Sequence, residues 1–207
     1  MKIGFLTNHI SYGGTEVALY DYAHHNETLL GNTSVILTRD FRSTHSEIYS
    51  KFEARFPVLY VSQHSDIDRI VVEQGLDCLY VIKSGELDWF YTTKCKCIVH
   101  CVFTTRYPHG TTYCAISNTL NKLHSTRVPV LPHMICVESH NDSFRSELSI
   151  PDGSLVLGRY GSYESFDIPI VWEAIVELLS RNPSVYFIDH LPVSIQPLDV
   201  LMIIAAS

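Results

Sequence analysis

The stretch KIGFLTNHISYGGTEVALYDYAHH (residues 2–25) decides the fold class, because a short apolar run is followed by a polar loop, two glycines and a helical pattern. The run KIGFLT has the length and composition of a buried strand. Gly13 and Gly14 allow a tight turn, and Thr15 is expected to cap a helix over residues 15–30. In α/β proteins, the loop between a strand and its following helix is a common place for a ligand.

The same alternation of apolar runs and helical segments continues to about residue 133. Strands are expected at 33–38, 58–62, 77–82, 96–103 and 112–117, and helices at 45–56, 66–75 and 118–125. Apolar strands separated by helices indicate a parallel sheet with helices on both faces. The predicted fold class is therefore α/β, with a Rossmann-like parallel sheet.

A second α/β domain is expected to begin after a polar linker. Residues 135–153 carry the turn signal Pro151-Asp152-Gly153 and a short predicted helix at 142–149. A strand at 155–161, an amphipathic helix at 167–182 and a strand at 184–188 follow. The expected organisation is a first domain at 1–134, a linker at 135–153 and a partial second domain at 154–207.

Composition limits the classes of partner. The net charge of −7 disfavours a nucleic-acid binder, which normally carries a basic face. No apolar run reaches the roughly 18–20 residues of a membrane span. The N-terminus has the pattern of a first strand and lacks that of a signal peptide, so a cytoplasmic location is expected.

Cys95, Cys97 and Cys101 cluster beside His100, and these residue types could form a zinc site. The segment has the composition of a strand, on which the three cysteines share one face and His100 lies on the other. Zinc ligands normally pair within turns. We therefore expect buried free thiols and no bound metal.

Two readings of the opening loop come from the residues alone. A dinucleotide site requires G-x-G-x-x-G after the first strand and an acidic residue after the second. This loop has one glycine pair, and Arg39-Asp40 follows the second strand. The loop thus matches the fingerprint of a nucleotide-dependent oxidoreductase only in part. The other reading is that the loop is a strand-to-helix turn without a binding role.

A third reading rests on several motifs in order. The Gly-Gly-Thr-Glu turn, IVHCVF (98–103), CAISNTLN (114–121) and RSELSIPDGSLVLGRYGSY (145–163) together resemble GT-B fold glycosyltransferases of the glycogen-synthase-like superfamily. The resemblance covers about residues 1–188. It implies a two-domain enzyme in which the first domain binds a glycan or other hydroxyl acceptor and the second binds a nucleotide-sugar donor. No separate cofactor or metal is implied, because the nucleotide-sugar is a substrate.

The resemblance also implies roles for particular residues. Gly13, Gly14 and Glu16 would bind substrate at the first turn, with Ser117 and His109 nearby. His100 would be catalytic and face the donor sugar. Arg159 would bind the donor diphosphate, since a guanidinium forms paired, charge-assisted bonds to phosphate.

The sequence departs from this family in two places. No Lys follows Arg159 in GRYGSYESFD, where the family supplies one for the diphosphate. The chain also lacks the paired-glutamate segment expected for the nucleotide, so we expect weak or absent transfer unless a partner chain supplies the donor domain. The alternative is a non-catalytic, Rossmann-like module that binds a glycan or a partner.

Overall fold

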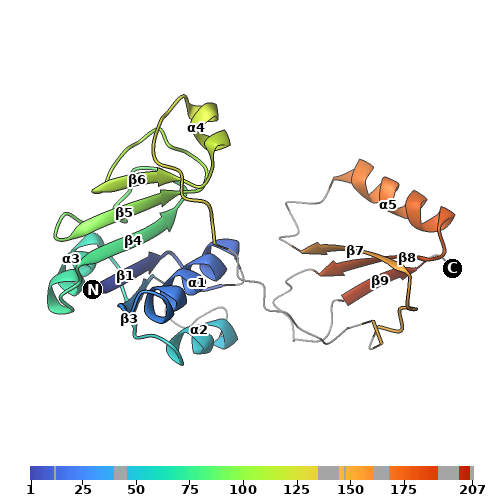
Figure 1. The fold of residues 1–207 in the computed structure, drawn as a ribbon, viewed down its shortest axis with the longest axis horizontal. Coiled ribbons are helices and arrows are strands. Elements are labelled where there is room, and N and C mark those ends of the chain that lie inside the picture. Colours follow the sequence, from blue (N-terminus) through green and yellow to red (C-terminus); the bar gives the residue numbers. More distant parts are fainter. Residues whose placement is uncertain are drawn as a thin grey trace. The chain divides into compact units, whose positions relative to one another are not determined.

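The structure is a computed structural model that describes residues 1–11, 13–39, 46–134, 145–146, 148–160, 168–190 and 201–205. The chain divides into two compact units, Met1–Val137 and Glu138–Ser207 (Figure 1). Each unit has its own sheet.

The first unit is an open parallel sheet of six strands. Its elements, in chain order, are β1 (Lys2–Thr7), α1 (Gly14–Thr28), β2 (Thr33–Thr38), α2 (Ser46–Glu53), β3 (Val58–Tyr60), α3 (His64–Glu73), β4 (Cys78–Lys83), β5 (Lys96–Cys101), β6 (Thr112–Ala115) and α4 (Asn118–His124). The strand order is β3-β2-β1-β4-β5-β6, and every neighbouring pair is parallel. The predicted α/β, Rossmann-like fold is confirmed.

Helices pack on both faces of this sheet (Figure 1). On one face, α1 and α2 bury an apolar cluster against β1, β2 and β4, with Leu19, Phe52 and Phe5 at its centre. On the other face, α3 and α4 contribute Ile67, Ile70 and Leu120 to a second cluster. Because both faces are covered, the strands are apolar without alternation, which is the pattern that predicted them.

The strand order reverses at β1, which lies between β2 and β4. The chain first builds outward from β1 to β3 and then continues from β4 on the other side. In open α/β sheets, ligands bind at the carboxyl ends of the strands where the order reverses. The fold therefore predicts a ligand site at the loops that follow β1 and β4.

Helix α1 begins one residue before the expected start, and its N-cap lies two residues before the expected cap. Its N-cap is Gly13, with φ −64° and ψ 150°, and the helix begins at Gly14. The expected cap, Thr15, is instead inside the first turn. A glycine is accepted as an N-cap because it leaves the first N–H groups open to water or a ligand.

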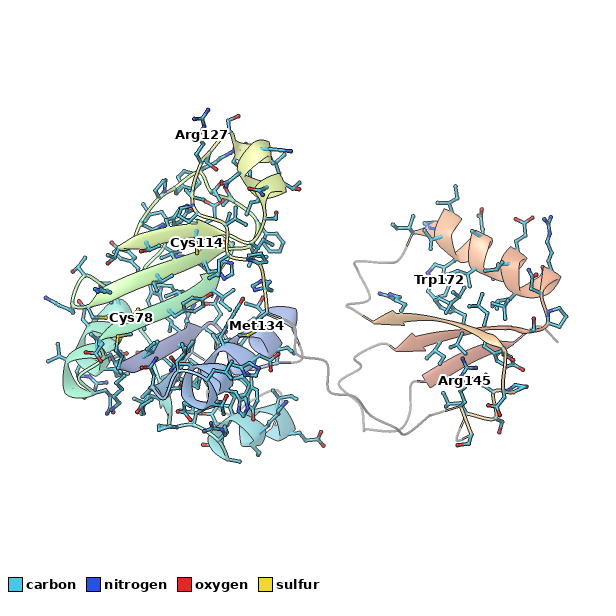
Figure 2. All side chains as sticks on the ribbon, viewed as in Figure 1. Cys78, Cys114, Arg127, Met134, Arg145 and Trp172 are labelled. Atoms are coloured by element: carbon cyan, nitrogen blue, oxygen red, sulfur yellow. The ribbon has the colours of Figure 1, made fainter. Side chains whose placement is uncertain are left out.

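The second unit contains β7 (Leu155–Tyr160), α5 (Pro169–Arg181), β8 (Val185–His190) and β9 (Leu201–Ala205). Strands β7 and β8 are parallel, and β9 pairs antiparallel with β8. Helix α5 packs on the strands through Trp172, Ile175 and Leu179, and Figure 2 shows Trp172 on the side of α5 that faces the sheet. The strand-helix-strand order predicted from residue 155 is present, and β9 was not predicted.

Most of the predicted linker, residues 135–144 and 147, lies outside the described residues, as does half of the predicted helix at 142–149. The described residues 145–146 and 148–149 form turns and are not helical. The loop that follows Arg159, at 161–167, also lies outside the described part. Among the described residues, no helix is both long enough and apolar enough to cross a membrane.

Candidate functional site

A cavity of about 230 Å³ lies where the strand order reverses. The end of β1 and its loop contribute Thr7, Asn8 and His9 to its wall, and the first turn of α1 contributes Thr15 and Glu16. The remaining wall consists of residues 82–84 at the end of β4 and residues 102–103 after β5. The topology and the cavity thus indicate the same place for a ligand.

Glu16 is the acidic side chain of this wall, and it is almost fully enclosed. It is 4% exposed, although it lies in the first turn of a helix. Its Oε1 accepts a hydrogen bond of 3.3 Å from Thr7 Oγ1, and its Oε2 accepts one of 3.2 Å from Ser11 Oγ. His9 Nε2 lies 3.9 Å from Oε1. A carboxylate offers about four lone-pair sites, so these two hydrogen bonds leave acceptor capacity for a ligand.

The two glycines of the predicted site have different surroundings. A Cβ on Gly13 would lie 2.3 Å from Glu16 Oε2, so this position has to be small for the carboxylate to remain in place. A Cβ on Gly14 would have no neighbour within 4 Å. Gly13 therefore fits a role in shaping the site through Glu16, whereas the surroundings of Gly14 require no glycine.

His100 lies near the carboxyl end of β5, as expected, but its ring is fully buried and does not line the cavity. Nδ1 is 2.7 Å from the hydroxyl of Tyr80, and the ring also neighbours Tyr22 and His133. Burial, with a smaller effect of His133, lowers the pKa of His100 to about 4. The expected orientation toward a cleft is not met, and the catalytic role of His100 stays a prediction.

Nε2 of His100 is also buried and makes no hydrogen bond within the described part of the chain. The ring is therefore a neutral imidazole in the core, fixed on one side by Tyr80. That arrangement corresponds to a core histidine held by the hydroxyl of a neighbouring tyrosine.

Ser117 and His109 both bind other parts of the protein. Ser117 is the N-cap of α4, and its Oγ accepts a hydrogen bond of 3.2 Å from the N–H of Leu120. His109 Nδ1 lies 2.6 Å from the carbonyl oxygen of Tyr107, so Nδ1 carries the proton. Its Nε2 then accepts from Lys83 Nζ at 3.1 Å. Neither residue lines the cavity, and their predicted substrate contacts stay predictions.

Lys83 is a further ionisable residue at the end of β4. Its side chain is 4% exposed, and its ammonium forms an ion pair with Asp88 in addition to the contact with His109. Burial lowers the pKa of His109, which favours the neutral ring that can accept from an ammonium. These contacts tie the loop after β4 to the loop before β6.

Arg159 belongs to the second unit. It is the penultimate residue of β7, near the carboxyl end of the strand, and it is 9% exposed. The proposed phosphate contact stays a prediction.

The cysteines that the structure describes in the first unit are free thiols. Cys97 and Cys101 are buried in the cluster beneath α3 and α4, whereas His100 contacts aromatic rings beside α1. The expected separation of these side chains onto two faces of the sheet is confirmed. In the described part of the chain, no group of three or more His, Cys, Asp or Glu side chains is arranged to hold a metal ion.

Several cavity residues were missed from the sequence, namely Thr7, His9, Lys83 and Ser84. Each of them ends or follows a strand on either side of the point where the order reverses. The rule that ligands gather there could have identified them, but it requires the order of strands, which the sequence does not give directly. Comparisons with protein-family models and with curated proteins find no match to this chain.

Proposed function

We propose that this chain is a glycosyltransferase-type protein whose first unit binds a hydroxyl-bearing acceptor in the cavity between β1 and β4. The observation that carries the proposal is the enclosed carboxylate of Glu16 in that cavity. A buried carboxylate with spare acceptor sites is suited to ligand hydroxyl groups, which donate hydrogen bonds to it.

The size and lining of the cavity support a small polar ligand. Its 230 Å³ is below the roughly 300–1,000 Å³ of sites for drug-sized molecules. That volume suits one sugar ring better than a whole dinucleotide, which disfavours the oxidoreductase alternative. Hydroxyl groups from Thr7, Thr15 and Ser84 accompany the carboxylate in the wall.

In the proposed reaction, the acceptor oxygen forms a bond to the anomeric carbon of the donor sugar. The bond from that carbon to phosphate breaks, and the nucleoside diphosphate leaves with the electron pair. The hydroxyl proton is released to a base. In this proposal Arg159 binds the donor diphosphate, where charge develops as the bond breaks.

The first test is binding, measured by saturation-transfer NMR and calorimetry with a panel of methyl glycosides. Glu16→Gln keeps the size of the side chain and removes its charge, and we expect it to weaken glycoside binding about tenfold, which corresponds to about 1.4 kcal/mol. Glu73→Gln on α3 is the matched control, because Glu73 is exposed and paired with Arg69. If no glycoside binds, or if the two variants behave alike, the proposed acceptor site is wrong.

The second test uses UDP-, GDP- and TDP-sugars, with release of nucleoside diphosphate as the readout. Release that depends on an added glycoside and decreases in Arg159→Gln supports transfer. Glycoside binding without any donor binding supports the non-catalytic module. Tight binding of NADH or NADPH, seen by fluorescence, supports the oxidoreductase.

A further inference from the structure

The charges of this chain are strongly segregated along its sequence. Residues 89–137 contain five of its 15 Lys and Arg and none of its 22 Asp and Glu. This segment contains β5 and β6, which lie at one edge of the first sheet, and the helix α4 that follows them. An acidic protein therefore has one region that is locally basic.

Hydrogen bonds join the segments that carry three of these cations. Thr105 Oγ1 lies 2.6 Å from Thr126 Oγ1, so the loop after β5 is joined to the turn after α4. Arg106 Nε donates to His124 Nδ1 at 3.1 Å, and His124 Nε2 donates to the carbonyl oxygen of Phe103 at 2.9 Å. The loop that carries Arg106 is thereby held against the end of α4, which carries Lys122, and the turn that carries Arg127.

The same surface exposes large apolar side chains. Phe103 is 72% exposed and Leu123 is 70% exposed, and they lie in the two segments that the hydrogen bonds join. We call the surface formed by Phe103, Arg106, Lys122, Leu123 and Arg127 the basic–apolar surface. Figure 2 shows Arg127 at the outer margin of the first unit.

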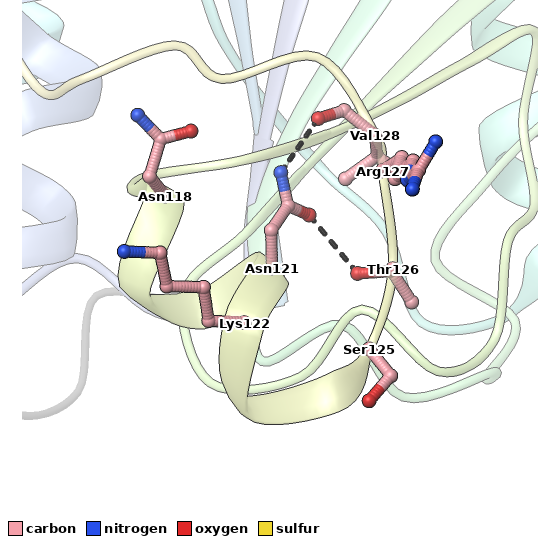
Figure 3. A pocket seen from close by; sticks show the side chains of 7 residues that line it. All are labelled: Asn118, Asn121, Lys122, Ser125, Thr126, Arg127 and Val128. Carbon is pink, nitrogen blue, oxygen red and sulfur yellow. Dashed lines mark hydrogen bonds between the residues drawn. The ribbon is translucent and has the colours of Figure 1, made fainter.

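An open hollow of about 640 Å³ adjoins the basic–apolar surface, and Lys122 and Arg127 line it. Asn121 lies between them and donates to the carbonyl oxygen of Val128 at 2.8 Å, while its Oδ1 accepts from Thr126 at 2.9 Å (Figure 3). Figure 3 also shows that Lys122 and Arg127 project in different directions, so they do not converge on one small ion. Side chains that project in different directions suit an extended array of negative charges.

We propose that the basic–apolar surface binds the surface of an anionic lipid bilayer. Peripheral binding of this kind combines cations near acidic headgroups with exposed Phe or Leu side chains that enter the interface. The carboxylates of an acidic peptide would pair with the cations, but such a peptide would leave Phe103 and Leu123 without an apolar environment. Charge complementarity and exposed apolar side chains together therefore favour a bilayer.

Co-sedimentation of the full chain with vesicles tests the proposal. Vesicles of phosphatidylcholine with 30% phosphatidylserine should bind the chain, and pure phosphatidylcholine vesicles should not. Each cation near an anionic surface contributes about fivefold in binding, so Arg106→Gln/Lys122→Gln/Arg127→Gln should lose about 100-fold. Binding should also weaken as salt rises, because surface charges are screened.

Lys94→Gln/Lys96→Gln is the matched control. It removes cations from the same segment, but these residues lie before and at the start of β5, whereas the loop with Arg106 follows the end of that strand. This control should lose less than about threefold, since its cations are further from the bilayer. Leu123→Ser tests the apolar component of binding. Leu123 does not line the acceptor cavity or the open hollow. We expect this variant to bind anionic vesicles about fivefold more weakly. Circular dichroism verifies that each variant is folded.

Three results would overturn the proposal: no binding to anionic vesicles, equal losses in the two charge variants, or an unchanged affinity of Leu123→Ser. Equal or tighter binding to a poly-glutamate peptide, with the same dependence on Arg106, would instead assign the surface to an acidic protein segment. None of these outcomes depends on whether Glu16 binds a glycoside, so this proposal and the proposed function can fail separately.

Discussion

The hydroxyl of Tyr80 on β4 lies 2.7 Å from Nδ1 of His100 on β5, and both side chains are buried beneath α1. Tyr22 of α1 packs on both rings, and its hydroxyl accepts a hydrogen bond of 3.1 Å from the N–H of Met134. This cluster therefore joins the sheet, its covering helix and the segment that leaves the first unit. Its stability depends on an uncharged imidazole.

We predict that acid destabilises the first unit through His100. Its folded pKa of about 4 lies below the ordinary value of 6.5, so the unfolded chain binds more protons between these values. The stabilisation is therefore complete above about pH 6.5 and decreases as the pH falls toward 4, by up to about 3 kcal/mol. Urea unfolding between pH 7 and pH 4.5 measures this slope.

A Trp172→Phe background makes this measurement specific to the first unit, because Trp89 is then the remaining tryptophan. Burial also lowers the pKa values of His109 and His133, so part of the slope belongs to them. The slope of unfolding free energy against pH measures how many protons the chain takes up when it unfolds. His100→Gln should reduce that number by up to one. An unchanged slope in this variant would show that His100 is not the titrating group.

We predict a large difference between two glycines with positive φ. Gly85 has φ +107°, and a Cβ there would lie 1.9 Å from the carbonyl oxygen of Thr104. Gly75 has φ +61°, and a Cβ there would have no neighbour within 4 Å. Gly85→Ala should cost more than about 3 kcal/mol, because it combines an unfavourable φ with a backbone clash. Gly75→Ala should cost about 1 kcal/mol, from the backbone conformation alone. Denaturant midpoints measured in parallel compare them, and similar costs would contradict the prediction.

The sequence predicted the fold more successfully than it predicted the site. The strands of the parallel sheet are continuous apolar runs, so β1 and β2 were predicted with their observed ends. The direction of single side chains was harder to predict. His100 follows the alternation of β5 and points into the core beside α1. Whether that position is buried depends on which side chains of α1 pack over this face of the sheet.

The enclosure of Glu16 was also not predictable from the sequence. A glutamate in the first turn of a helix is usually solvated, where it interacts with the helix dipole. Here the loop after β1 folds back, so that Ser11 and Thr7 donate to the carboxylate. Burial of this kind is set by the path of an irregular loop, for which the sequence carries no periodic signal.

We predict that Asp88 and Lys83 stabilise the protein only as a pair. Asp88→Ala would leave the ammonium of Lys83, which is 4% exposed, without its carboxylate. Removing one partner of a buried pair is costly, but Asp88 is 39% exposed, so we expect about 1–2 kcal/mol. The double variant Lys83→Met/Asp88→Ala removes the unpaired charge and should be more stable than Asp88→Ala. Chemical denaturation of the two variants tests this order, and a double variant that is less stable than the single one would contradict it.

We predict that Ser117 acts as a helix cap and that aspartate can replace it. Its Oγ accepts from the N–H of Leu120 at the start of α4, so Ser117→Ala should cost about 1 kcal/mol of unfolding free energy. Ser117→Asp provides another good N-cap and should recover most of that stability, with the added benefit of a negative charge at the helix start. A residue that bound a ligand hydroxyl or phosphate would not be rescued in this way, because the carboxylate would change the charge and hydrogen bonding of the site.

Denaturant unfolding followed by Trp89 fluorescence, together with glycoside binding for both variants, separates the two roles. Loss of glycoside binding in Ser117→Ala at unchanged stability would show that Ser117 belongs to the ligand site after all.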